Sequence, residues 1–346
     1  MIHPPNARLS RFLYACALDL RRLTLAAVVL LCACDISTPS TTTSTAPPAG
    51  GASVSSQASV APARLVATKR LNDREVDLTV ESPAVGEQVK VRLLLPASYQ
   101  TGKSRRWPVL YLLHGCCDSY LSWTRSTDVS KLTAHSDVIV AMPEGGKVGF
   151  YSDWRSGPGW ETFHTAELPN LLARQYRAGP VAAIAGVSMG GLGALNYAAR
   201  HPGMYIVAAS FSGIVHTRLS PDESQGYLGL VSSQGEDPQA LWGDPDADVD
   251  TWKQHNPYDL ASQLSDVRLF ISAGNGDPGP LDRKGTGHDS TETALGAENR
   301  AFADRVQELG LNAQIDLYGP GTHNWIYWKR ELHRAWPLIN DQLGRQ

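Results

Sequence analysis

The sequence predicts an α/β fold in which a mostly parallel sheet is covered by helices on both faces. Two observations carry this prediction. Short, continuously apolar runs alternate with segments of helical spacing, and strands that are buried on both faces have this apolar character. In addition, His114, Ser188, Asp277 and His323 each follow closely after an apolar run, where ligands bind in sheets of this type.

The N-terminal part of the 346-residue chain has the pattern of an export signal. Arg21 and Arg22 precede an apolar run at 23–31, which is too short to span a bilayer comfortably. The run ends in Leu-Cys-Ala-Cys34, which resembles a bacterial lipobox. We therefore expect a signal peptide over 1–34 with Cys34 as a lipidated first residue, or, as the alternative, an ordinary signal peptide that is cut nearby.

A segment of different composition follows this signal. Residues 36–62 are rich in Ser, Thr, Ala, Pro and Gly and carry no charge. Such a segment buries too little apolar surface to order itself. We expect a disordered tether over 35–66 and one folded domain over 67–346.

The folded domain is predicted to open with two antiparallel strands. The elements after them follow from the spacing of apolar residues. Strands are expected at 76–80, 89–95, 107–113, 138–142, 181–185, 206–211, 268–273 and 313–318. Helices are expected at 160–176, 191–200 and around 298–309, with a closing helix beyond 325. Residues 216–264 interrupt the alternation and are either an insertion that covers part of the site or a surface excursion.

The overall composition excludes several functions. The net charge is −3 and no basic stripe suggests a nucleic-acid partner. The folded domain keeps two cysteines, Cys116 and Cys117, which are adjacent and either form a disulfide or remain free thiols. No Cys/His cluster has the spacing of a metal site, so the sequence implies no metal and no organic cofactor.

The most informative motif is the pentapeptide at 186–190, which has the pattern Gly-x-Ser-x-Gly. An apolar run precedes it and a helical stretch of small residues follows it, which is the strand–turn–helix context of a nucleophile elbow. The alternative is an ordinary strand-to-helix turn. The context favours Ser188 as a catalytic nucleophile, exposed at a sharp turn.

A serine hydroxyl reacts only when a base takes its proton, and His323 is the candidate base. His323 lies in a Gly-Thr-His loop near the C-terminus, as the chain order serine, acid, histidine requires. His114 begins a His-Gly loop after the strand at 107–113, a position that shapes an oxyanion hole. The backbone N–H groups of Cys116 and Met189 are expected to bind the oxyanion.

The sequence pattern alone does not decide which acidic residue orients His323. Position favours Asp277, which lies in a loop just beyond an apolar strand. Glu292 is the second candidate and Asp289 is a distant third. Turn-forming aspartates and glutamates at helix N-termini are common for purely structural reasons.

Several sequence blocks together resemble the antigen-85 mycolyltransferases and, more broadly, the esterase D-like branch of the α/β-hydrolases. The agreement in order and spacing extends over roughly 107–338. The blocks are Phe150-Tyr151-Ser152-Asp153-Trp154, Trp160-Glu161-Thr162-Phe163, Glu167-Leu168-Pro169, Gly186-Val187-Ser188-Met189-Gly190, Gly274-Asn275-Gly276 and Gly321-Thr322-His323-Asn324-Trp325-Ile326-Tyr327-Trp328. The resemblance implies an α/β-hydrolase fold with Ser188 as nucleophile, His323 as base and Glu292, rather than the runner-up Asp277, as acid.

The chain departs from the antigen-85 pattern at one informative place. Those enzymes carry Asp-Gly-Leu-Arg after the third core strand, where the Asp and Arg help to hold trehalose. This chain has His-Gly-Cys-Cys at 114–117. We therefore expect an exported serine esterase that acts on a small acyl ester or glycolipid. The alternatives are an acyltransferase for cell-envelope sugars or glycolipids and a non-catalytic binding member of the fold.

Overall fold

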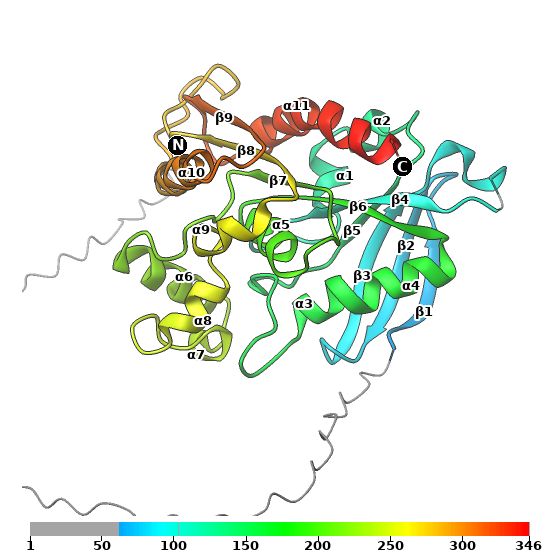
Figure 1. The fold of residues 1–346 in the computed structure, drawn as a ribbon, viewed down its shortest axis with the longest axis horizontal. Coiled ribbons are helices and arrows are strands. Elements are labelled where there is room, and N and C mark those ends of the chain that lie inside the picture. Colours follow the sequence, from blue (N-terminus) through cyan, green and yellow to red (C-terminus); the bar gives the residue numbers. More distant parts are fainter. Residues whose placement is uncertain (1–61, 103, 346) are drawn as a thin grey trace, which may run out of the picture. The chain divides into compact units, whose positions relative to one another are not determined.

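The computed structural model describes residues 62–102 and 104–345 (Figure 1). The predicted signal peptide, the lipidated Cys34 and most of the predicted tether lie outside these residues. The predicted start of the folded domain at residue 67 is wrong by three residues, because strand β1 covers Arg64–Arg70 and pairs with β2. β1 is absent from the predicted strands because its side chains are mostly exposed and show no apolar run.

The described strands form one nine-stranded sheet in the order β1-β2-β3-β5-β4-β6-β7-β8-β9. The pairs from β1 to β5 are antiparallel, and the strands from β5 to β9 in this order are parallel. The remaining strands are β2 Glu75–Ser82, β3 Glu87–Leu94, β4 Trp107–Leu113, β5 Ile139–Pro143, β6 Ala178–Val187, β7 Val207–Phe211, β8 Arg268–Gly274 and β9 Ala313–Gly319. All eight predicted strands are therefore present.

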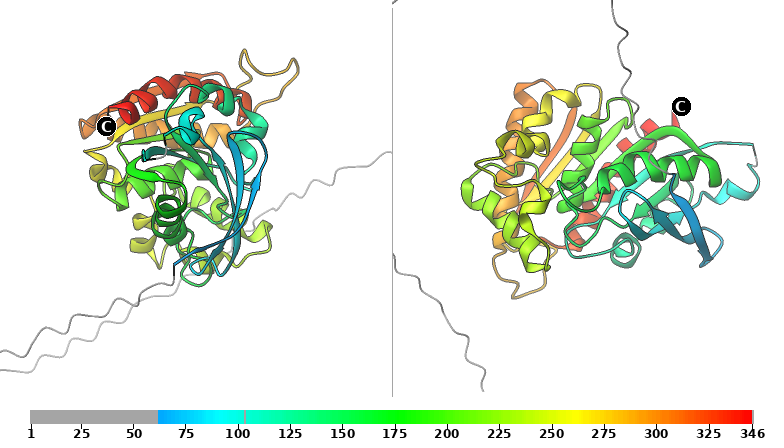
Figure 2. Two further views of the ribbon diagram at one scale, coloured as in Figure 1. Left: turned by 90° about the vertical axis from the view of Figure 1, so that its right-hand side faces the viewer. Right: turned by 90° about the horizontal axis from the view of Figure 1, so that it is seen from below.

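Helices cover both faces of the sheet, as predicted (Figure 2). One face packs against α1 Ser122–Ser126, α2 Val129–Leu132 and α11 Trp325–Gly344. The other face packs against α4 Leu168–Gln175, α5 Met189–Arg200 and α10 Ser290–Glu308. A short 3₁₀ helix, η1 Ala97–Gln100, precedes β4. None of the helices in the described part of the chain combines the length and apolar character that a bilayer crossing requires.

Two predicted helices differ in detail. The segment predicted as one helix at 160–176 comprises α3 Trp160–Thr162, a π-helical stretch η2 Phe163–Glu167, and α4. Pro169 lacks an N–H and cannot donate to the carbonyl four residues earlier, which favours a local change of helix type. Helix α10 starts eight residues before the predicted one, because Asp289 caps its N-terminus.

The interruption at 216–264 is a set of short helices. They are α6 Pro221–Ser233, α7 Pro238–Leu241, α8 Val249–Gln254, α9 Pro257–Leu260 and the 3₁₀ helix η3 Ala261–Leu264. Trp242 and Trp252 are fully buried and anchor this group to the core. Helix α6 lies beside the carboxyl ends of the strands, so the insertion covers part of the site, as one of the two alternatives predicted.

Candidate active site

The turn between β6 and α5 holds Ser188 in a left-handed conformation, with φ 54° and ψ −121°. The chain passes very close to itself here. A Cβ built on Gly186 would lie 2.0 Å from the carbonyl oxygen of Gly190, and one built on Gly190 would lie 2.5 Å from the carbonyl oxygen of Leu113. Only glycine fits at either position, so the two glycines of the pentapeptide make this sharp turn possible.

His323 follows β9 and forms a hydrogen bond with a carboxylate. Its Nδ1 lies 2.7 Å from Oε2 of Glu292, which is the third residue of α10 and is fully buried. Because Nδ1 is bonded to Glu292, Nε2 is the ring nitrogen of His323 that remains for contact with another group. His323 and Ser188 both line one cavity at the carboxyl ends of the strands.

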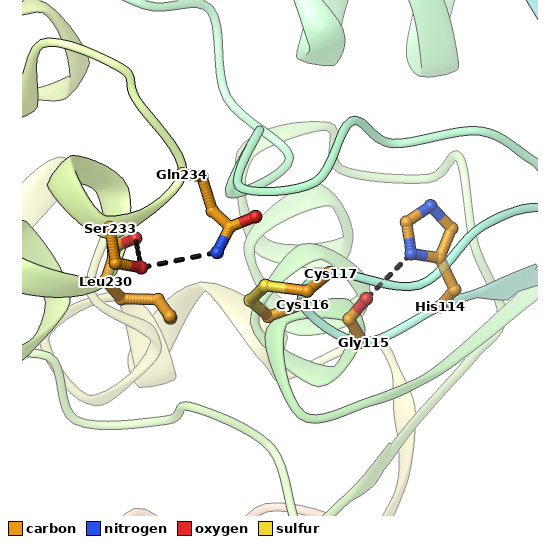
Figure 3. Close-up of a disulfide and its surroundings, with 7 residues drawn as sticks. All are labelled: His114, Gly115, Cys116, Cys117, Leu230, Ser233 and Gln234. Carbon is orange, nitrogen blue, oxygen red and sulfur yellow. Dashed lines mark hydrogen bonds between the residues drawn. A yellow bond between two sulfur atoms is a disulfide. The ribbon is translucent and has the colours of Figure 1, made fainter.

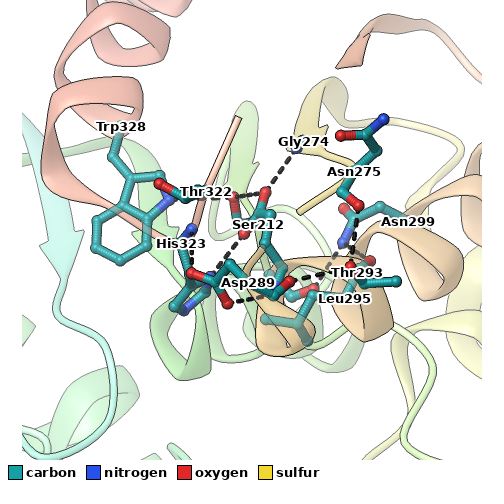
Figure 4. A network of polar contacts seen from close by, with 12 residues as sticks. Ser212, Gly274, Asn275, Asp289, Thr293, Leu295, Asn299, Thr322, His323 and Trp328 are labelled. Carbon is teal, nitrogen blue, oxygen red and sulfur yellow. Dashed lines mark hydrogen bonds and ion pairs between the residues drawn. The ribbon is translucent and has the colours of Figure 1, made fainter. Parts of the chain in front are cut away.

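The second oxygen of Glu292 is held by Ser212, which directly follows β7, and by Gly274 at the end of β8; Figure 4 labels these two residues. Its Oε1 accepts a hydrogen bond from the Ser212 hydroxyl at 2.8 Å and one from the backbone N–H of Gly274 at 2.6 Å. The Trp328 indole N–H in turn donates to the Ser212 oxygen at 3.1 Å. The carboxylate is therefore fixed in position and its charge is compensated without contact with solvent.

Two further carboxylates hold the loop that carries His323. Asp289 accepts the backbone N–H of His323 at 2.9 Å, and Asp282 accepts the hydroxyls of Thr322 at 2.6 Å and Tyr327 at 2.8 Å. Although desolvation acts to raise it, these hydroxyls and the Gly279 N–H keep the pKa of Asp282 below its ordinary value. The loop is thus tied on both sides of the histidine.

Asp277, which position alone favoured as the acid, is not bonded to His323. It is exposed and pairs with the equally exposed His288, with Oδ1 3.1 Å from Nδ1 of that ring. The carboxylate that contacts the His323 ring is that of Glu292, the residue that the family resemblance implies as the acid. Asp289, the third candidate, contacts the backbone of His323 and not its ring.

The supporting roles of Ser212, Asp282, Asp289 and Trp328 are not among the predictions from the sequence, although two of these residues carry a recognisable signal. Asp289 stands three residues before Glu292, which is the spacing of a helix N-cap and its partner glutamate. Ser212 directly follows the strand predicted at 206–211, where functional groups gather. Asp282 and Trp328 carried no such signal, because their roles depend on contacts between segments that are distant in the sequence.

The loop after β4 lies against the nucleophile turn. A Cβ on Gly115 would be only 3.2 Å from Cβ of Ser188. Met189 is the first residue of α5, so its N–H has no partner inside the helix. His114 is buried and accepts the N–H of Gly145 through Nε2 at 2.9 Å, which stabilises the loop and keeps the imidazole away from the cavity.

Cys116 and Cys117 are joined by a disulfide, which is one of the two predicted states (Figure 3). Cys117 has a positive φ of 62° and donates its N–H to the carbonyl of Lys147 at 2.8 Å. The bridged pair lies between the Ser188 turn and the end of α6, near Leu230 and Gln234. The predicted oxyanion loop is therefore covalently constrained.

Two adjoining cavities, each of about 440 Å³, meet at Ser188 and share Cys116, Leu230 and Thr291. The first, here called the histidine cavity, also contains His323 and Trp325. The second, here called the apolar cavity, lies between α6 and α10, and Ile214, Tyr227 and Leu295 are among its lining residues. Both are of the size that binds small organic ligands, which typically occupy about 300–1,000 Å³.

Glu298 holds the walls of the apolar cavity together. It is fully buried on α10 and accepts the N–H groups of Val215 at 2.8 Å and His216 at 2.9 Å, as well as the hydroxyl of Tyr227 on α6. Burial raises the pKa of Glu298 to about 7, although these hydrogen bonds act to lower it. In the described residues, no group of three His, Cys, Asp or Glu side chains could hold a metal ion.

Several known proteins are similar to this chain in sequence and architecture. The model of the family described as "Putative esterase" matches residues 82–339. The diacylglycerol acyltransferase/mycolyltransferase Ag85A of Mycobacterium leprae (strain TN) is 32% identical over 282 residues, 77% of this chain and 83% of that protein. The corresponding Ag85B of Mycolicibacterium smegmatis is 33% identical over 291 residues, 77% and 85% of the two chains.

A solved structure, Mycobacterium tuberculosis MPT51 (FbpC1), matches with a TM-score of 0.64 and 25% identity, over 76% of this chain and 97% of that one. The predicted resemblance to the antigen-85 branch is thus confirmed, and so is the α/β-hydrolase fold. Because the family model covers well over half of its length, this chain belongs to that esterase family and is a serine hydrolase or acyltransferase.

Proposed function

We propose that the chain is an exported serine esterase that hydrolyses carboxylic esters through an acyl-enzyme on Ser188. The observation that carries the proposal is the hydrogen bond between His323 Nδ1 and the buried Glu292, in a histidine that lines the same cavity as Ser188. A serine, a histidine and a buried carboxylate in this chain order form the catalytic unit of many acyl-transfer enzymes.

In the proposed reaction, Ser188 Oγ attacks the acyl carbonyl carbon while His323 Nε2 takes its proton. Glu292 holds the imidazole in the tautomer with Nδ1–H and stabilises the imidazolium. The N–H groups of Cys116 and Met189 bind the oxyanion. His323 then returns the proton to the leaving alcohol oxygen. In the second half of the reaction, water attacks the acyl carbonyl carbon while His323 takes its proton, and His323 returns that proton to Ser188 Oγ as the free acid leaves.

The acyl group and the alcohol of an ester can bind in different cavities beside Ser188. We assign the acyl group to the apolar cavity, whose walls from α6 and α10 offer apolar contact. The histidine cavity then receives the alcohol, because the leaving oxygen must meet His323. A small or medium acyl chain is the substrate class that this division supports.

Acyl transfer is the second candidate, since the relatives Ag85A and Ag85B are named diacylglycerol acyltransferase/mycolyltransferase. The loop after β4 argues against trehalose as the acceptor. The resemblance places the two sugar-holding side chains of antigen-85 at positions 114 and 117. Here His114 is buried and Cys117 is bonded to Cys116. Each unmade hydrogen bond to a sugar hydroxyl costs about 1–3 kcal/mol.

We therefore predict that p-nitrophenyl esters of graded acyl length are hydrolysed and that added trehalose diverts little of the product. The measurement is the ratio of free acid to acyl-trehalose as the trehalose concentration rises, with glycerol as a matched acceptor without a sugar ring. A ratio that swings to acyl-trehalose at millimolar acceptor, but not with glycerol, would place the transferase function first.

We also propose that the chain is held at the cell envelope by a lipid on Cys34, a residue outside those that the structure describes. Its support is the sequence alone: the basic and apolar segments and the lipobox-like end. Mass spectrometry of the native protein should find a diacylglyceryl-modified Cys34 as the first residue. An unmodified first residue within 35–62 would reject the anchor and leave export as the remaining part of the proposal.

A further inference from the structure

The loop between β5 and α3 contacts the predicted oxyanion loop, 114–117, near both of its ends (Figure 3). The carbonyl of Lys147 accepts the N–H of Cys117 at 2.8 Å. Tyr151, in the same loop, donates its hydroxyl to the carbonyl of His114 at 2.9 Å. These two hydrogen bonds hold the predicted oxyanion loop from both sides.

The ring of Tyr151 also packs against the helix that follows the nucleophile. Tyr151 is buried, with 1% of its surface exposed. A Cβ on Gly193 of α5 would lie only 2.5 Å from Cγ of this ring, and a Cβ on Gly145 would lie 2.6 Å from its Cζ. The ring fits here because both neighbours are glycine. One side chain therefore joins α5 to the predicted oxyanion loop.

The backbone at this place adopts a conformation that residues other than glycine rarely take. Phe150 and Tyr151 are consecutive and both have a positive φ, of 48° and 49°. The Ser152 hydroxyl donates to the carbonyl of Phe150 at 2.9 Å, and the buried indole N–H of Trp242 donates to the same hydroxyl oxygen at 3.0 Å. Strain of this kind persists where the surrounding structure holds it, and it is concentrated at functional sites.

The two elements that Tyr151 joins carry the two expected oxyanion donors. Met189 is the first residue of α5, four residues before Gly193, and Cys116 lies two residues after His114. Donors of this kind stabilise a transition state only when both lie at hydrogen-bond distance from the developing oxyanion. Burial raises the pKa of Tyr151 well above its ordinary value, so its hydroxyl remains a donor near neutral pH.

We propose that Tyr151 is a positioning residue that sets the distance between the N–H groups of Cys116 and Met189. The inference rests on the proposed function, because these donors act in ester chemistry at Ser188. Tyr151 is not among the residues that line the histidine cavity or the apolar cavity. It acts on the reaction through the loop that its hydroxyl holds and through the helix that its ring contacts.

The test is Tyr151→Phe, which keeps the ring and removes only the hydroxyl. We expect kcat/KM for p-nitrophenyl butyrate to fall by about ten-fold, mostly in kcat, with KM within about two-fold. The loss is smaller than the 10²–10³-fold typical for removal of a whole oxyanion donor, because the donor is displaced and not deleted. An alkyl trifluoromethyl ketone forms an adduct on the serine that carries an oxyanion. Its affinity should fall by the same factor as kcat/KM.

Tyr197→Phe is the matched control. Tyr197 is fully buried on α5, and its hydroxyl lies 3.0 Å from Nδ1 of His164. This variant also removes one buried hydroxyl and its hydrogen bond, so it should lower the melting temperature about as much as Tyr151→Phe. Because Tyr197 does not contact the predicted oxyanion loop by a hydrogen bond, kcat/KM and ketone affinity should stay within about two-fold of the wild type.

Ser152→Ala makes the test independent of whether Tyr151→Phe folds. It keeps the Tyr151 hydroxyl and removes the hydrogen bond to Phe150, so kcat and ketone affinity should fall together by about three-fold. The inference is rejected if a folded Tyr151→Phe, or Ser152→Ala in its place, keeps both values, or if Tyr197→Phe loses as much of both. A wild type that hydrolyses no ester would instead reject the proposed function.

Discussion

Replacing Ser188 by alanine should lower ester hydrolysis by about 10³-fold or more while the protein stays folded. The acyl-enzyme cannot form without the hydroxyl, and the remaining histidine and oxyanion donors give only residual catalysis. The Ser188 side chain makes no capping hydrogen bond to α5, so its removal takes no support from the fold. The measurement is kcat/KM with p-nitrophenyl butyrate, together with far-UV circular dichroism and the melting temperature.

Ser272→Ala is the matched control for this variant. Ser272 lies on β8, is fully buried, and its hydroxyl has no hydrogen-bond partner among the described residues. Its change removes a hydroxyl from the same sheet without touching the catalytic cavities, so turnover should stay near that of the wild type. Near-wild-type turnover by Ser188→Ala would instead show that Ser188 is not the nucleophile.

Glu292→Gln should lower kcat by about 10²–10⁴-fold, whereas Asp277→Asn should remain close to the wild type. The glutamine keeps the size of Glu292 but removes the negative charge that stabilises the His323 imidazolium. Its amide group also brings a donor into a place where the Ser212 hydroxyl and the Gly274 N–H already donate. Asp277 is exposed and contacts His288, so we expect its charge to have no part in the proposed reaction.

The comparison is made with one ester at saturating concentration, so that kcat and not substrate binding is measured. Both variants are checked by circular dichroism, because Glu292 is fully buried and Asp277 is not. If Asp277→Asn were the inactive variant and Glu292→Gln active, the assignment of the acid would be wrong, and the loop at 275–289 would have to move during the reaction.

Much of the fold could be predicted from the sequence, because the central strands are buried on both faces and appear as apolar runs. The runs at 107–113, 181–185 and 268–273 all became strands of the sheet. β1 could not be found in this way. It lies at the edge of the sheet, where its exposed side chains need not be apolar.

The candidate site was predictable to a smaller extent. The elbow sequence pointed to Ser188 because the turn has strict steric needs. The partner of His323 could not be deduced from position, since both Asp277 and Glu292 follow the same strand. Only the fold decides which of them reaches the ring: Asp289 starts α10 so that Glu292, in its first turn, is buried against Ser212 and His323.

The close packing at the turn around Ser188 limits what the Gly-x-Ser-x-Gly pattern indicates about catalysis in a member of this family. Gly186 and Gly190 are required because a Cβ at either place would collide with the backbone. That requirement would persist if Ser188 no longer reacted, so a binding protein descended from an enzyme would keep both glycines for as long as it kept the turn. The pentapeptide is therefore evidence for the strand–turn–helix fold and not, by itself, for catalysis. The buried Glu292, whose charge is stabilised by Ser212 and Gly274, is better evidence that catalysis is retained. A protein that no longer catalyses the reaction gains nothing from burying a carboxylate.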